Sequence, residues 1–191
     1  MFTGTYALLM AEYNRWMNEK TYAACATLTD EERKRDRGAF FKSIHATLNH
    51  LLSADGIWMG RFNGQEYPRA APGQLLHDDF AELRAAREAL DGAILDWARA
   101  VTPEQLAEPM TWIAKVYAFT QTHPRWVQVA QMFNHQTHHR GQVHAMLTGA
   151  GIDIGPTDLP MSPILLEGSD SGGGRLPPRE DPHDRDELRR G

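Results

Sequence analysis

Apolar residues recur at helical spacing in several long stretches of the chain. Between residues 2 and 16, and again between residues 76 and 97, they follow one another in alternating steps of three and four. Such steps keep side chains on one face of an α-helix. The pattern predicts a first helix over about 2–16 and a third long helix over about 76–97. Similar stripes predict a second long helix over about 39–61 and a fourth over about 124–147.

Shorter signals fall between these helices. Thr29 and Thr102 each stand three residues before a Glu or Gln, which predicts an N-cap for a short helix at both places. Gly38 ends the first of these short helices, and residues 63–73 are typical of a loop. Aromatic and β-branched residues dominate 110–119 and favour a small hairpin or extended crossover with its turn near Ala114.

Together these elements predict an all-α fold. We expect a four-helix bundle with a long crossover between helices 3 and 4, covering residues 1–166 as one domain. Apolar residues between 152 and 165 predict an ordered arm that packs over the bundle. The composition of 167–191 is rich in Gly, Ser, Pro and charge, and such a segment buries too little to order itself. It is therefore predicted to be a disordered polar tail.

Two histidines lie in the middle of the apolar stripe of the fourth helix. His135 and His139 are four residues apart, and Met132, Val143 and Met146 lie within about 40° of His139 on a helical wheel. Two imidazoles one turn apart can bring their ring nitrogens onto one metal ion. A single buried His is usually a hydrogen-bonded core residue, but a pair favours a metal. A third ligand has to come from another element.

His50 is the candidate third ligand. On the second long helix its neighbours on the same face are mostly small: Ala39, Ser43, Ala46 and Ala54 lie within about 40°. Small residues leave space beside the imidazole, which suits a ligand at the floor of a cavity. Close helix–helix packing also uses small residues, so this alternative stays open. If the second and fourth helices are neighbours, His50 can meet His135 and His139.

Other polar residues are weaker candidates. His45 points about 140° away from His50 and is predicted to lie at a surface or interface. Arg87 interrupts an apolar seam, so its side chain either reaches solvent at the bundle edge or offers a cation to a substrate carboxylate. Glu12, Asp55 and Arg87 are possible contacts behind the metal ligands or to the substrate. No residue is assigned as a general base.

Composition narrows the class of protein. The formal net charge of −5 and the absence of a Lys/Arg stripe argue against a nucleic-acid partner. No apolar run approaches the roughly 20 residues of a membrane span, and the N-terminus does not have the form of a signal peptide. Cys25 is the only cysteine, so neither an internal disulfide nor a thiolate metal cluster can form. A cytoplasmic location is the simplest expectation.

Three phrases carry a family resemblance. Residues 43–52 followed by Asp55 and Trp58, then residues 134–142, and finally residues 155–160 resemble the signatures of the DinB family, the DinB/YfiT-like metalloenzymes. The resemblance covers roughly residues 1–166. It implies a four-helix bundle that is often a homodimer, with a divalent metal held by His50, His135 and His139. His138 matches a position that is not a ligand.

The resemblance also implies a range of chemistry. Three neutral His leave a metal its positive charge and open coordination positions, and imidazole ligands suit Zn, Ni, Fe or Cu. Similar proteins include thiol-dependent S-transferases and a mycothiol-dependent maleylpyruvate isomerase. We expect a metal-dependent transferase or hydrolase acting on a small-molecule substrate, with a small-molecule thiol as a second cofactor in the first case. The alternatives are a non-enzymatic, stress-related dimeric bundle with a structural metal, and three core His without metal.

Overall fold

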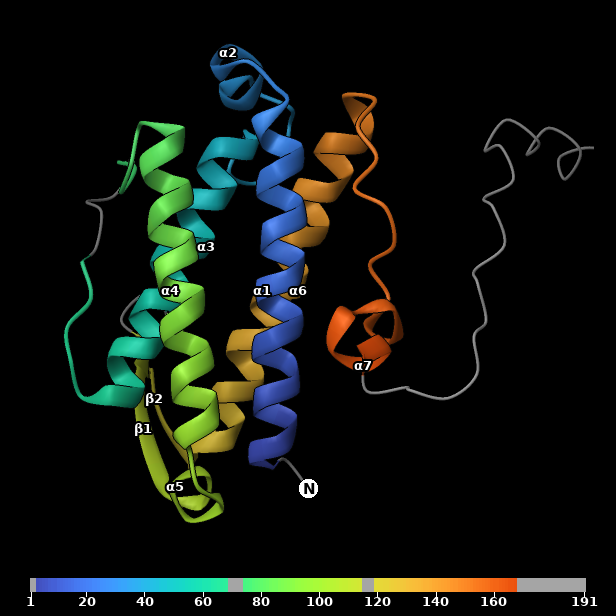
Figure 1. The fold of residues 1–191 in the computed structure, drawn as a ribbon. Coiled ribbons are helices and arrows are strands. Elements are labelled where there is room, and N and C mark those ends of the chain that lie inside the picture. Colours follow the sequence, from blue (N-terminus) through green and yellow to red (C-terminus); the bar gives the residue numbers. More distant parts are fainter. Residues whose placement is uncertain (1–2, 69–73, 115–118, 168–191) are drawn as a thin grey trace, which may run out of the picture.

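The computed structural model describes residues 3–68, 74–114 and 119–167, and most of them are helical (Figure 1). The elements, in chain order, are α1 (Gly4–Ala26), α2 (Asp30–Lys34), α3 (Ile44–Asn63), α4 (Phe80–Ala100), α5 (Pro103–Ala107), β1 (Pro109–Ala114), β2 (Phe119–Pro124), α6 (Arg125–Gly149), the 3-10 turn η1 (Leu159–Met161) and α7 (Pro163–Glu167). The tail was predicted over residues 167–191: Glu167 is the last residue of α7, and residues 168–191 lie outside the described residues. Within the described part of the chain, no helix is long and apolar enough to cross a membrane.

The four long helices pack in a closed order. α1 contacts α4 and α6, and α3 contacts the same two helices from the other side (Figure 1). Apolar side chains from the facing surfaces fill the centre, among them Leu52, Ile94, Val129 and Val143, which are almost completely buried. The predicted long connection leads from α4 to α6 through α5 and the hairpin. The consequence for the site is that α3 and α6 are direct neighbours.

Three helix boundaries differ from the prediction, and one of them is the start of α4, which lies at Phe80 instead of Leu76. α1 continues ten residues beyond Trp16, to Ala26. Past Trp16, buried polar side chains such as Asn18 and Thr21 are mixed with buried apolar ones such as Met17 and Tyr22, which interrupts the hydrophobic pattern. α3 starts at Ile44 instead of Ala39, with the Ser43 hydroxyl accepting a hydrogen bond from the Ala46 amide. Lys42 has a left-handed backbone, with φ 67°, which prevents the helix from starting earlier.

The predicted short elements form as well. The Thr102 hydroxyl and the Gln105 side chain make a reciprocal capping box at α5, and Thr29 caps α2. The hairpin is confirmed: β1 and β2 pair antiparallel, with Ala114 opposite Phe119. Its second strand continues to Pro124, so the hairpin is longer than 110–119. The arm predicted after α6 packs through Ile154, but Ile164 and Leu165 are exposed, contrary to the prediction.

A network of charged and amide side chains is buried at the centre of the long helices. Arg87 of α4 lies between Asp55 of α3 and Asp91 of its own helix, with nitrogen–oxygen distances of 2.6 and 2.8 Å. The Asn14 and Asn18 amides of α1 each donate a hydrogen bond to Asp91, at 3.0 Å. All four long helices take part, because Arg140 of α6 donates to the Asn14 carbonyl oxygen.

Both expectations for Arg87 were therefore wrong. Arg87 as a whole residue is 2 % exposed, so its side chain does not reach solvent. Its guanidinium contacts two protein carboxylates instead of facing a substrate. Asp55 was considered above as a contact to the metal ligands, and it is the partner that neutralises Arg87. Burial raises the pKa of the Asp55 carboxyl. The apolar seam tolerates Arg87 because its buried charge lies between two carboxylates of opposite sign.

Removing Arg87 should strongly destabilise the fold. In an Arg87→Met variant, Asp55 and Asp91 would stay buried without a cation, and the free energy of unfolding should fall by about 3–5 kcal/mol. The matched control on the same helix is Arg84→Met, which removes an exposed pair with Glu88 and should cost less than about 1 kcal/mol. Urea unfolding of both variants measures the difference. Equal small losses would show that the network does not support the fold.

Candidate metal centre

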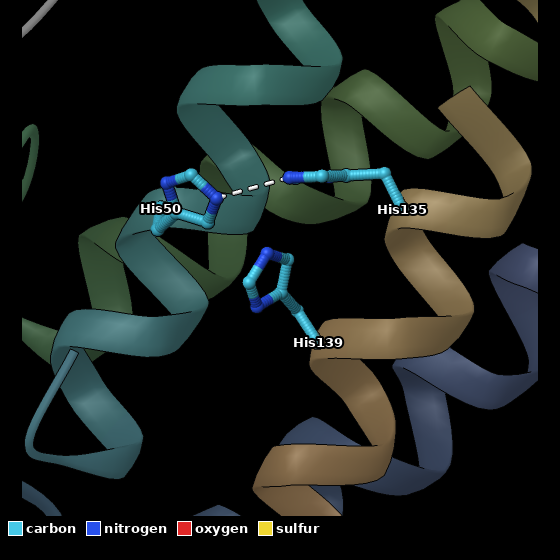
Figure 2. Close-up of side chains that lie close together, drawn as sticks. All are labelled: His50, His135 and His139. Carbon is cyan, nitrogen blue, oxygen red and sulfur yellow. Dashed lines mark hydrogen bonds between the residues drawn. The ribbon is translucent and has the colours of Figure 1, made fainter. Parts of the chain in front are cut away.

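Three imidazoles from two neighbouring helices converge between α3 and α6. His135 and His139 lie one turn apart on α6, and His50 faces them from α3 (Figure 2). One ring nitrogen of each residue lies within 4.8 Å of the other two. The Nε2 atoms of His50 and His135 are 3.1 Å apart. The structure thus brings together the three residues that the helical spacing had selected.

Burial keeps these rings uncharged. His139 is 8 % exposed, and the other two are partly buried. Burial, reinforced by the neighbouring imidazoles, lowers the pKa of His50 to about 3 and the pKa of His135 to about 4. Burial also lowers the pKa of His139. At neutral pH all three present neutral rings with a free lone pair, which is the form that binds a metal.

A glutamine fixes the proton of one ring. The Oε1 atom of Gln142 lies 2.8 Å from Nδ1 of His139, and its amide nitrogen lies 3.2 Å from the exposed His138 ring. Because a carbonyl oxygen only accepts, Nδ1 of His139 carries the hydrogen and Nε2 carries the lone pair. Hydrogen bonding to the far nitrogen is the usual way in which proteins orient metal-binding His.

A phenylalanine covers the site on the α3 side. The Phe41 ring stacks on His50 with a centroid distance of 3.9 Å and an interplanar angle of 23°. The same ring lies 5.5 Å from His139. Next to it opens a cavity of about 500 Å³ that has His50 in its wall. The imidazole cluster is thus shielded on one side and adjoins a solvent-accessible cleft on another.

The donor set fits a divalent metal with open positions. Four-coordinate zinc with nitrogen ligands at about 2.0–2.1 Å requires nitrogens about 3.3 Å apart. The 3.1 Å separation of the His50 and His135 nitrogens is close to this value, and His139 offers a ring nitrogen within 4.8 Å of the ligand atoms of both. Among the described residues, the cluster contains neither a carboxylate nor a cysteine. Three protein ligands and an adjoining cleft are typical of catalytic rather than structural sites.

The structure contradicts the prediction for one histidine, His45. His45 is completely buried, and its Nε2 atom lies 3.0 Å from the backbone oxygen of His77, so it is neither a surface nor an interface residue. The helical-wheel argument failed because the segment before α4 crosses that side of α3. His138, which the family resemblance matches to a position that is not a ligand, is exposed.

Two residues of the site escaped the sequence analysis. Gln142 could have been found, since a spacing of three residues on a helix places it beside His139. Phe41 could not: on the predicted helix from Ala39 it lies about 180° from His50. Only the left-handed turn at Lys42 brings its ring over His50.

Comparisons with known proteins agree with this architecture. The chain is 26 % identical over 163 residues to Protein DinB of Bacillus subtilis (strain 168), covering 80 % of this chain and 91 % of that protein. The crystal structure of a DinB-like protein from Bacillus cereus ATCC 10987 superposes with a TM-score of 0.58 at 16 % identity, covering 73 % of this chain and 89 % of that one. The sequence profile of the DinB family matches residues 1–166. The chain therefore belongs to the DinB family.

Proposed function

We propose that this protein is a metal-dependent enzyme that holds a divalent ion through His50, His135 and His139. The observation that carries the proposal is the convergence of three neutral imidazole nitrogens beside an open cleft. The proposal includes a four-helix bundle of the DinB/YfiT-like type, which the closed packing order of α1, α4, α3 and α6 supports. Zn, Ni and Fe all suit this donor set.

The donor set favours hydrolysis or thiol S-transfer. When bound, a divalent ion with three neutral ligands keeps its full charge and supplies an activated water or a small-molecule thiolate as nucleophile. The chain's own contribution is to hold the ion, to orient His139 through Gln142, and to cover one face of the His50 ring with Phe41. The cleft then admits a small-molecule substrate.

Composition and the family resemblance support a proposal for the partners, the compartment and the oligomeric state of the protein. A net charge of −5 disfavours nucleic acid and an acidic membrane surface as partners. We propose a cytoplasmic homodimer, as the family resemblance implies. The second candidate is a stress-related dimeric bundle in which the metal only ties α3 to α6. The cleft of about 500 Å³ beside His50 favours the enzyme, because a structural metal needs no access for a substrate.

Metal content tests the ligands directly. The purified wild-type protein should contain about one divalent ion per chain, and His50→Ala should lose it with little change in helical content, because two imidazoles on α6 remain too few for tight binding. His138→Ala, on the same helix as the pair but exposed, is the matched control and should keep its metal. Elemental analysis and circular dichroism measure both. Equal metal in wild type and His50→Ala would refute the assignment.

The pH dependence of stability reports on the buried rings. In the metal-free protein, the lowered pKa values of His50 and His135 mean that the unfolded chain binds protons below about pH 6.5 that the folded state does not. The free energy of unfolding should therefore fall as the pH drops from about 6.5 towards 4. His50→Gln should make this decline shallower, by up to about 1.4 kcal/mol per pH unit.

An exposed residue on the same helix as His135, Thr148, has no titratable side chain and provides the control for this measurement. Thr148→Ser should leave the slope of unfolding free energy against pH unchanged. Urea titrations at stepped pH values give the slopes. Identical slopes in wild type and His50→Gln would show that the His50 ring gains its proton as readily in the folded protein as in the unfolded chain.

Activity separates the enzyme from the structural alternative. The metal-loaded protein should transfer a small-molecule thiol to an electrophilic acceptor or hydrolyse an ester, and His139→Ala should reduce the rate at least about 100-fold. A panel of thiols with electrophilic acceptors, and of activated esters, measures this. If metal-loaded protein has no activity on the panel, while metal removal lowers the melting temperature, the structural alternative is supported instead.

A further inference from the structure

The cleft beside His50 has mostly apolar walls. The ring of Phe41 forms one side, Leu75 and Leu76 form another, and Phe40 stands at the rim with 82 % of its surface exposed. A volume of about 500 Å³ suits a small organic molecule and is much larger than a water or an ion requires. Aromatic and aliphatic walls favour a ligand with a flat, apolar body.

The polar groups of the cleft are few, and one of them is not available. The Asn49 amide donates hydrogen bonds to the backbone oxygens of His45 and His77, and its oxygen accepts from the His77 amide. These three bonds leave it little capacity for a ligand. Ser53 and Gln74 complete the uncharged polar lining. Selectivity for charge must therefore come from another residue.

Among the described residues that line this cleft, Lys42 is the one charged side chain and none is a carboxylate. Its ammonium lies 3.5 Å from Asp36, but both side chains are largely exposed, at 77 % and 60 %. An exposed pair of this kind contributes little and exchanges readily for another anion. Lys42 supplies a positive charge at the cleft, and a divalent ion at the imidazoles would add to it.

The backbone at Lys42 is strained in a way that serves the cleft. Its φ of 67° is unusual for a residue other than glycine. Hydrogen bonds of 2.7 Å, from the Lys42 amide to the Ala39 oxygen and from the Arg37 amide to the Lys42 oxygen, hold this conformation. The turn places the Phe41 ring on His50 and the Lys42 side chain at the cleft. Strain of this kind persists where the surrounding structure enforces it, often at ligand sites.

We infer that this cleft binds a small molecule with a flat apolar body and a carboxylate group, and that Phe41 and Lys42 determine this specificity. The apolar body lies against Phe41 and the leucines, and the carboxylate faces Lys42. Cationic molecules are disfavoured, because the cleft offers positive charge and no described carboxylate. The inference rests on the proposed function only in taking this ligand to be the substrate of the metal centre.

Two matched probes test the inference on the full chain loaded with zinc. The first is 2-naphthoate, and the second is 2-naphthylmethylammonium, which has the same ring system and the opposite charge. Calorimetric titration should show naphthoate binding at least about tenfold more tightly than the ammonium compound. Lys42→Gln should weaken naphthoate by about three- to tenfold and leave the ammonium probe unchanged or slightly tighter.

Phe41→Leu tests the aromatic wall. It keeps apolar volume but removes the ring face, and it should weaken both probes by about three- to tenfold. The matched controls are Arg84→Gln, an exposed cation on α4, and Phe119→Leu, a partly exposed ring on the hairpin; both should bind like wild type. Equal affinity for the two probes, absence of naphthoate binding, or a lack of effect of both cleft variants would overturn the inference.

Zinc content, measured on every sample, separates this inference from the proposed function. If the protein takes up no zinc, the metal centre is refuted, and titration of the metal-free protein still tests Lys42 and Phe41 by the same comparison of probes. If zinc binds in stoichiometric amount but the probes do not discriminate, the metal centre stands and the specificity of the cleft is refuted. Naphthoate that binds through zinc alone would be unaffected by Lys42→Gln and lost on zinc removal, which would also refute the role of Lys42.

Discussion

The position of Arg87 between two buried aspartates is the constraint on which the arrangement of helices depends. A buried charge without a partner costs several kcal/mol, so Arg87 of α4 must lie level with Asp55 of α3. Asn14 and Asn18 then fix α1 against Asp91, and Arg140 fixes α6 through Asn14. Apolar surfaces pack acceptably in several registers, but this network is satisfied in one. Sliding α3 by one turn, about 5.4 Å, would separate Asp55 from its cation.

The same register places the imidazoles. Asp55 stands five residues after His50 on α3, and Arg140 directly follows His139 on α6, so the network that aligns these helices also sets the height at which the rings meet. The charged network around Arg87 and the imidazole cluster thus lie in adjacent layers of the helix bundle. In one layer, charges neutralise each other inside the protein. In the next, neutral rings with lowered pKa values keep lone pairs available beside a cleft. The first layer supplies rigidity, and the second supplies a site that a cation can complete.

Much of this could be predicted from local pattern. Helical periodicity located the four long helices, capping residues located α2 and α5, and the four-residue spacing of His135 and His139 identified the pair. The predictions failed where contacts between residues distant in sequence determine whether a side chain is buried. Arg87 looked misplaced in its seam because Asp55, its partner, is 32 residues away in sequence. His45 looked exposed because the chain around His77 that covers it is equally distant. The end of α1 was placed too early because Asn18, which is buried against Asp91 of α4, is polar and gives no hydrophobic signal.

The sequence by itself determined which surfaces would be buried and that His50, His135 and His139 would face inward, because the period of an α-helix converts residue spacing directly into direction. Only the tertiary structure decided how the rest of the site was assembled. The left-handed backbone of Lys42 turned Phe41 onto His50, and the packing of α3 beside α6 brought nitrogens from distant segments to within 4.8 Å. Periodicity sets direction about a helix axis, but the distance between helices and the path of a loop depend on contacts that no local pattern contains.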